Sequence, residues 1–180
     1  MFDLDQFIAD LRASATERSR QAMQAIVARA IRDTASLYRA IGTPDEAGAQ
    51  VLYHGQDLTV LNIKWAPGQM TLPHNHMLGA VIGMYDGRED NVFWRKVPNP
   101  ERFQIEAAGG KAIGSGDVCV LGKDIIHSVI NPVSRISGAI HVYDGDFFNP
   151  HRSMWAAETL TEEPYEQSRV SSFRAPLRPA

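Results

Sequence analysis

The chain has 180 residues and a net charge of −3, with 18 basic and 21 acidic side chains. This length favours one structural domain, and because the basic residues form no cluster, neither nucleic acid nor an anionic membrane is an expected partner. A small-molecule partner fits this composition better. Without a signal sequence or a run of about 18 apolar residues, we expect a cytoplasmic protein. The single cysteine, Cys119, lies in an apolar run and is expected to be a small buried side chain.

Two amphipathic α-helices are predicted over residues 3 to about 40. Apolar residues recur there at helical spacing, first from Leu4 to Leu11 and then from Met23 to Tyr38. Ser14 and Glu17 form a capping-box pattern that predicts the start of the second helix. The Gly-, Pro- and acid-containing segment 41–48 has the composition of a connector. We therefore predict an N-terminal helical segment over residues 1–48.

Short β-rich runs separated by turn residues follow, and we assign residues 49–150 to a barrel. The predicted strands cover residues 58–65, 79–85, 91–95, 103–107, 118–121, 128–130 and 136–143. Turns are expected at Pro67–Gly68, Asp86–Gly87 and Gly109–Gly110, among others. Evenly spaced short strands of this kind predict a sandwich or a jelly-roll barrel. Residues 151–180 are expected to form a C-terminal extension that wraps the barrel and frays at its end, within the same structural domain.

Three histidines lie at intervals that suit a metal site. His74 and His76 share a face only if their segment is extended, and Pro73 favours extension. His127 precedes the apolar run 128–130, where an adjacent strand can bring a third imidazole to the same pocket. Each histidine could instead be an ordinary polar residue, but the combined spacing predicts one bound metal ion.

The residues around these histidines resemble the two sequence motifs of the cupin superfamily. The matching positions are Gly68, His74, His76, Gly87, Gly116, His127 and Asn131. The resemblance implies a mainly β fold, the cupin double-stranded β-helix or jelly-roll barrel, with two N-terminal α-helices. Ala80 replaces the glutamate ligand usual in the first motif, and Gly122 and Asp124 replace the usual Pro and Gly of the second.

A second pair, His141 and Tyr143, lies two residues apart on a predicted strand. With this pair the chain resembles the thiol dioxygenases, the cysteine dioxygenase type of cupin, which hold iron with three histidines and no glutamate. The resemblance implies that His74, His76 and His127 bind Fe(II), with His141 and Tyr143 beside them as catalytic residues. It implies a non-haem iron dioxygenase that oxidises a small thiol to a sulfinate with O2, as a monomer or a homodimer.

The chain departs from that family beside the His141–Tyr143 pair and at the position that would bind the substrate's carboxylate. The family's serine before the histidine is Ala139 here, and its carboxylate-binding arginine would fall near Tyr53–His54, where no arginine stands. Arg88, Arg95 and Arg152 are the other candidates, and each is expected to be a solvated surface charge. The sequence leaves the identity of the substrate open.

Other functions fit the same residues. One is a different metal-dependent cupin enzyme, such as a dioxygenase that cleaves a carbon skeleton or an isomerase; another is a non-catalytic cupin that holds Zn or Ni. In every case three neutral imidazoles leave the ion's charge uncompensated, so the site would attract an anion. Tyr143 could instead be an aromatic that closes the barrel mouth, and Asn131 is expected to cap the turn at Pro132.

Overall fold

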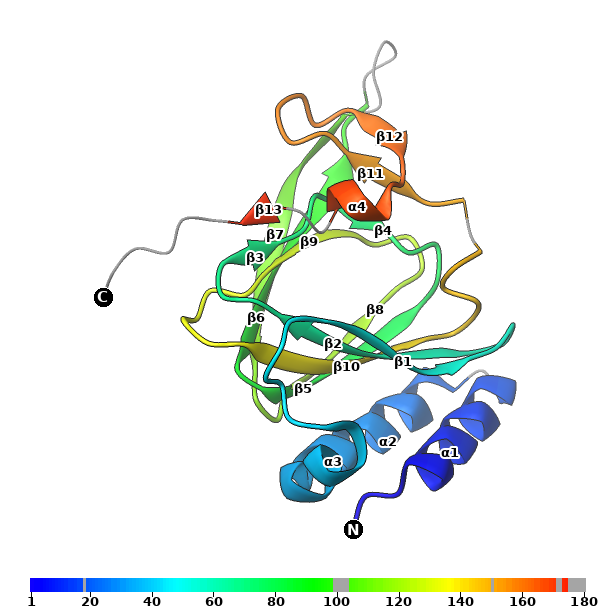
Figure 1. The fold of residues 1–180 in the computed structure, drawn as a ribbon. Coiled ribbons are helices and arrows are strands. Elements are labelled where there is room, and N and C mark those ends of the chain that lie inside the picture. The colour runs from blue at the N-terminus through cyan, green and yellow to red at the C-terminus, as the bar shows by residue number, and fades with distance from the viewer. Residues whose placement is uncertain (18, 99–103, 150, 171–172, 175–180) are drawn as a thin grey trace.

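The computed structural model describes residues 1–17, 19–98, 104–149, 151–170 and 173–174. Three helices open the chain: α1 (Leu4–Thr16), α2 (Arg20–Arg32) and α3 (Thr34–Ile41). They lie together on one side of the molecule, against a sheet (Figure 1). The predicted N-terminal helices are present, but the second of them is divided at Asp33 into α2 and α3. The Asp33 carboxylate accepts a hydrogen bond from the Ser36 amide and so begins α3 as a new helix.

The predicted start of the second helix at Ser14 is wrong. Ser14 is buried inside α1, and its hydroxyl donates a hydrogen bond to the Leu11 carbonyl. Ser19 caps α2 instead, because its side-chain oxygen accepts a hydrogen bond from the Ala22 amide. A serine hydroxyl that bonds back into its own helix does not start a new one.

The strands form two antiparallel sheets. The first has the order β1-β2-β10-β5-β8 and contains β1 (Gly48–His54), β2 (Thr59–Trp65), β5 (Ala80–Asp86), β8 (Val118–Leu121) and β10 (Ser137–Tyr143). The second has the order β12-β11-β4-β9-β3-β13, with β6 joined to β9 and β7 joined to β6. Its strands are β3 (Gln69–Met70), β4 (His74–Asn75), β6 (Arg88–Lys96), β7 (Ile105–Gly114), β9 (Ile126–Ile130), β11 (Ser153–Trp155), β12 (Glu162–Pro164) and β13 (Phe173–Arg174). A short helix, α4 (Gln167–Val170), precedes β13.

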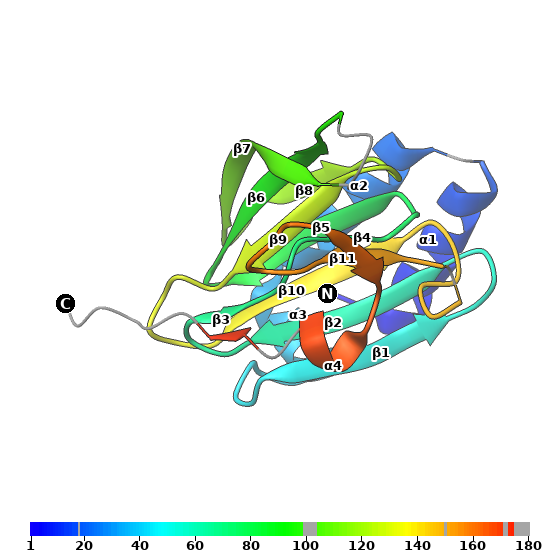
Figure 2. The ribbon, with the colours of Figure 1, turned by 90° about the horizontal axis from the view of Figure 1, so that it is seen from above.

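Eight of these strands have the connectivity of a jelly roll. The order β2-β10-β5-β8 in one sheet accompanies β4-β9-β6-β7 in the other, and the chain crosses repeatedly between the two sheets. The long pair β6 and β7 lies on the opposite side of the molecule from β1 (Figure 2). The predicted mainly β jelly-roll barrel with N-terminal helices is therefore confirmed.

Strand β10 separates two apolar layers, and all seven of its residues are buried. Its residues Ile140 and Val142 belong to a cluster shared with the helices, whereas Ala139 and Tyr143 belong to a cluster inside the barrel. Side chains alternate between the faces of a strand, so one face of β10 holds the helices and the other faces the interior. Helix α2 approaches closely where Gly83 stands, since a Cβ there would lie 2.4 Å from Val27 Cγ1.

The predicted strands agree with the observed ones to within a few residues, except that β7 continues to Gly114; residue 103 lies outside the described part of the chain. The turn predicted at Gly109–Gly110 is wrong, because both residues lie inside β7. Gly109 pairs with Phe93 and Ala107 with Trp94, so the chain makes a β-bulge there, and the positive φ of Gly109 suits it. Strands β1, β3, β11, β12 and β13 were not predicted, and β4 was expected only as an extended segment.

The C-terminal segment adds strands to the second sheet, since β11 pairs with β4 and with β12, and β13 pairs with β3. The predicted fraying concerns residues 175–180, which lie outside the described residues. Within the described part of the chain, none of the helices has the length and apolar character needed to cross a bilayer.

Candidate metal centre

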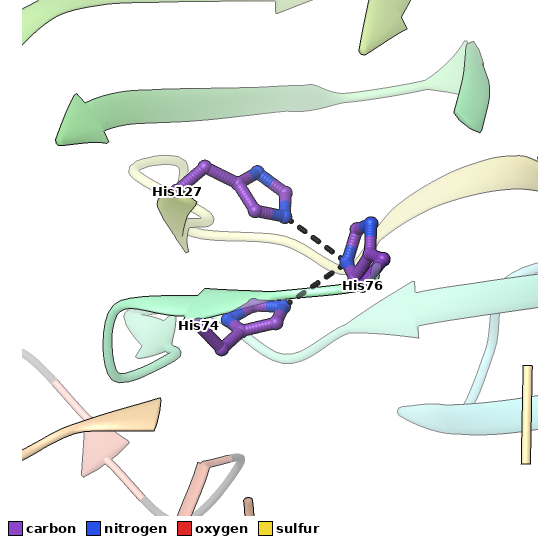
Figure 3. A group of neighbouring side chains, drawn as sticks. All are labelled: His74, His76 and His127. Atoms are coloured by element: carbon purple, nitrogen blue, oxygen red, sulfur yellow. Dashed lines mark hydrogen bonds between the residues drawn. The ribbon is translucent and has the colours of Figure 1, made fainter. Parts of the chain in front are cut away.

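The fold brings the three predicted histidines together inside the barrel. His74 on β4 is the register partner of His127 on β9, and His76 follows β4. The Nε2 atom of His76 lies 3.2 Å from that of His74 and 3.2 Å from that of His127, and the three rings converge (Figure 3). All three side chains are buried. They are the one group of metal-ligating side chains of this size found among the described residues.

Hydrogen bonds turn the imidazole lone pairs toward the centre of this cluster. His74 Nδ1 lies 2.9 Å from the Leu72 carbonyl, and His127 Nδ1 lies 2.8 Å from Asn91 Oδ1. Both partners are acceptors, so each Nδ1 carries the proton and each Nε2 presents a lone pair. Metal-binding histidines have this arrangement, in which the second nitrogen donates to a carbonyl or carboxylate oxygen.

Two of the three Nε2 separations, those that involve His76, fit a divalent metal ion, and all three ligand atoms lie within 4.8 Å of one another. Metal–nitrogen bonds of about 2.0–2.1 Å at angles between octahedral and tetrahedral place neighbouring nitrogens roughly 2.8–3.4 Å apart. The observed separations of 3.2 Å lie in that range. His76 Nε2 has at most one proton to donate, so in the metal-free protein one of its two short contacts joins two lone pairs. A cation between the rings would remove that repulsion.

Burial keeps the three imidazoles in the neutral form that binds metal. It lowers the pKa of His74 to about 4, and Arg152 and His141 add to this effect. It lowers the pKa of His76 and of His127 well below the usual value, and the neighbouring histidines lower both further. Neutral ligands are required for metal binding, so the cluster is in the binding form at neutral pH.

Ala80 occupies the β5 position where the first cupin motif usually has its glutamate. Its side chain is buried, and its register partners are Tyr143 and Leu121. Within the described residues, no carboxylate joins the three histidines. An ion held here would therefore keep its full double charge and favour an anionic ligand.

His141 and Tyr143 lie on β10 and line the same cavity as the three histidines. The Tyr143 hydroxyl is 3.3 Å from His141 Nδ1, and the Tyr143 ring packs edge-on against His76 with centroids 5.0 Å apart. Burial raises the pKa of Tyr143 well above its usual value, and the nearby Tyr165 and Glu89 raise it further. The phenol therefore stays protonated at the wall of the cavity.

Of the three arginines considered from the sequence, Arg88 and Arg95 are on the surface as expected. They pair with Asp90 and Glu106. The same expectation is wrong for Arg152, which lines the cavity with the histidines. The guanidinium carbon of Arg152 lies 3.8 Å from the centroid of the Tyr165 ring and 4.2 Å from that of Phe147.

This stacking fixes the Arg152 guanidinium but leaves part of its hydrogen-bonding capacity unused. Its Nη1 atom is buried and has no hydrogen-bond partner among the described residues. A guanidinium presents several N–H donors in a planar fork that matches a carboxylate. Arg152 therefore gives the cavity wall a positive charge.

The cavity has a volume of about 670 Å³, within the range of small-molecule sites. Asn131 is not among its lining residues. The amide of Asn131 donates hydrogen bonds to the Trp65, Ala66 and Arg135 carbonyls, and its oxygen accepts one from the Val133 amide. The predicted turn-capping role of Asn131 is confirmed.

Sequence reasoning missed two polar residues near the site, Glu89 and Asn91. Both are buried on β6, and Asn91 bonds directly to His127. They stand in the run Arg88-Glu89-Asp90-Asn91, which has the composition of a solvated segment. Their spacing of two residues was the available signal, because it puts both on one face of a strand.

No family model matches the chain. Among solved structures it is similar to a mutant of oxalate decarboxylase from Bacillus subtilis, with 17% identity and a TM-score of 0.45 over 58% of this chain and 27% of that one. It is similar to oxalate oxidase in complex with the substrate analogue glycolate, with 13% identity and a TM-score of 0.45 over 61% of this chain and 55% of that one. A conserved protein of unknown function from Streptococcus pyogenes is similar too, with 15% identity and a TM-score of 0.44 over 56% of this chain and 75% of that one. The chain thus spans about a quarter of the oxalate decarboxylase and about half of the oxalate oxidase. Likenesses of this size say nothing about reaction or substrate.

Proposed function

We propose that this protein is a metal-dependent enzyme that binds Fe(II) through His74, His76 and His127 and oxidises a small thiol acid to a sulfinate with O2. One observation carries the proposal. The three histidines, Tyr143 and Arg152 line a single cavity, and within the described residues no carboxylate joins the histidines.

The charge of the site favours an anionic substrate. Three neutral imidazoles leave the charge of a divalent ion uncompensated, and Arg152 adds a further positive charge. A thiol acid would supply two negative groups, a thiolate and a carboxylate. The carboxylate can accept hydrogen bonds from the guanidinium of Arg152, which lines the cavity.

Tyr143 supports the reaction as a hydrogen-bonding group at the cavity wall. His141 holds the phenol in place through the contact between Nδ1 and the hydroxyl. An iron ion bound at the histidines would supply the redox chemistry by which O2 reacts with a thiolate. Both atoms of O2 end on sulfur, so the electrons that sulfur loses reduce O2 and no other reductant is needed.

The alternatives are another metal-dependent cupin enzyme, whether a carbon-skeleton dioxygenase or an isomerase, and a non-catalytic cupin that holds Zn or Ni. A cavity with two sources of positive charge would also accept a dicarboxylate. Oxalate, a small dicarboxylate, is therefore a necessary comparison substrate.

The test is oxygen uptake by iron-reconstituted protein with mercaptopropionate, cysteine, cysteamine and oxalate, with the products identified by mass spectrometry. We expect a thiol acid to consume one O2 per sulfinate formed, and His76→Ala to abolish uptake. Turnover of oxalate with no thiol oxidation would overturn the thiol assignment in favour of another cupin enzyme. No oxygen uptake with any of the four compounds in iron-loaded protein would overturn the proposal that the site oxidises thiols.

A further inference from the structure

Glu89 is a buried carboxylate in the barrel interior. Its side chain on β6 is fully buried, and the Nε2 atom of His141 lies 3.7 Å from its Oε2. An isolated buried carboxylate is strongly unfavourable unless hydrogen bonds and charge compensate it. Glu89, which lies beside the candidate site, therefore needs partners that stabilise its carboxylate.

Two donors face Glu89, one at each oxygen. The Trp65 indole donates to Oε2 at 2.9 Å, and the Asn91 amide nitrogen donates to Oε1 at 2.9 Å. An ionised carboxylate accepts at both ends, whereas a glutamine has one accepting end and one donating end. A neutral glutamine of the same shape would therefore set its own amide against one of these donors.

The hydrogen bond to Glu89 fixes which end of the Asn91 amide faces His127. Because Nδ2 of Asn91 is used by Glu89, its Oδ1 faces His127 Nδ1 at 2.8 Å. An oxygen there requires the proton of His127 to lie on Nδ1. The lone pair of His127 Nε2 is then free to face His76 and His74.

Glu89 also faces His141 directly. Its Nε2 is buried and has no hydrogen-bond partner within the described residues, and Glu89 is the negative group beside it. A proton on Nε2 is attracted by that carboxylate, and Nδ1 is then left to accept from the Tyr143 hydroxyl. Ala139, two residues before His141, has no hydroxyl with which to bond the ring.

We propose that Glu89 is a positioning residue that sets the proton positions on both sides of the site. Through Asn91 it holds His127 as an Nδ1–H tautomer, and directly it holds His141 as an Nε2–H tautomer that orients Tyr143. The effect of the His127 tautomer on metal binding rests on the proposed function, but the two tautomers themselves do not.

The tautomers can be measured without any reaction, by long-range proton–nitrogen correlation NMR of metal-free protein labelled with nitrogen-15 histidine. We expect a proton on Nε2 with Nδ1 free of one in His141, and a proton on Nδ1 with Nε2 free of one in His127, with the signals assigned through His141→Gln and His127→Gln. In Glu89→Gln we expect at least one of the two patterns to change, while exposed His54 and His151 keep theirs. A proton on Nδ1 of His141 in the wild type would overturn the proposal even if no variant folds. Unchanged tautomers of both residues in folded Glu89→Gln would overturn it as well.

Zinc affinity tests whether Glu89, through Asn91, supports metal binding by His127. Mutation of a partner of a metal ligand weakens binding by about 10- to 100-fold, and we expect a loss in this range for Glu89→Gln. The matched control is Glu106→Gln, a surface carboxylate paired with Arg95, which should bind zinc like the wild type.

A second substitution, Trp65→Phe, separates hydrogen bonding from packing. It removes the donor at Oε2, so in combination with Glu89→Gln the introduced glutamine could turn its oxygen to Asn91. We expect this double variant to bind zinc more tightly than Glu89→Gln, whereas additive losses would show that Glu89 acts only in packing. A wild-type protein that binds neither zinc nor iron would overturn the proposed function, and the NMR result would still decide the tautomers.

Discussion

Arg152→Met tests the substrate assignment most sharply. The methionine keeps a flexible apolar side chain between Phe147 and Tyr165 and removes the guanidinium. A hydrogen bond to a charged group contributes about 1.5–3 kcal/mol, and the guanidinium of Arg152 at the cavity wall can donate at least one to a carboxylate. Losing roughly 2–3 kcal/mol lowers kcat/KM for a thiol acid by about 30- to 150-fold. Because the contact is made equally before and during the reaction, we expect KM to rise and kcat to hold.

The assay is steady-state oxygen uptake with mercaptopropionate, which has a carboxylate, and cysteamine, which has none. Cysteamine turnover should be unaffected or improved in Arg152→Met, because a positive charge near its ammonium group is gone. Arg95→Met, at a surface arginine paired with Glu106, is the control and should behave like the wild type. Equal losses with both substrates, or an unchanged KM for mercaptopropionate, would refute the assignment of Arg152 to the carboxylate.

Three further predictions follow from the same geometry. Tyr143→Phe removes only the hydroxyl, so kcat should fall by at least about 10-fold while iron content holds; unchanged turnover would return Tyr143 to a packing role. The pKa of His74 is about 4 when folded and 6.5 when unperturbed, so the unfolded chain takes up protons first as the pH falls. The free energy of unfolding of the metal-free protein should therefore be highest above about pH 6.5 and should fall by roughly 3 kcal/mol toward pH 4 because of His74 alone. His76 and His127 should lower it in the same direction. Urea titrations across that range check this prediction, and a flat profile would contradict it. Cys119 is buried and its burial raises the pKa of the thiol, so Cys119→Ser should keep nearly full activity; loss of activity in a folded variant would mean that the thiol takes part.

The parts of the fold with a local pattern were predictable from the sequence. The apolar runs of β2, β5, β8 and β10 are largely buried, and turn residues bound them. Strand β1 is an edge strand whose residues are mostly exposed, so no apolar alternation marks it. Strands β11 and β12 are three residues each, too short for a period to be visible.

The residues of the candidate site likewise differ in whether a local sequence pattern predicts them. His74, His76, His141 and Tyr143 were found because i, i+2 spacing on a strand is a local signal. Arg152 was misjudged because its burial depends on Phe147 and on the distant Tyr165, a pairing that no spacing rule predicts.

Glu89 was missed for a related reason. Its neighbours in sequence are charged, and its partner His141 lies far along the chain on another strand. Contacts made by the fold decide the role of such a residue, and its composition alone suggests a solvated surface.

The central claim is that three imidazoles hold one metal ion in the barrel. Its most direct test is the metal content of protein purified without oxygen, measured by elemental analysis beside His76→Ala. We expect about one iron per chain in the wild type and loss of that iron in the variant, since removing one of three ligands destroys the site. A wild-type protein that carries no metal and takes up none, or a His76→Ala variant that keeps its iron, would contradict it.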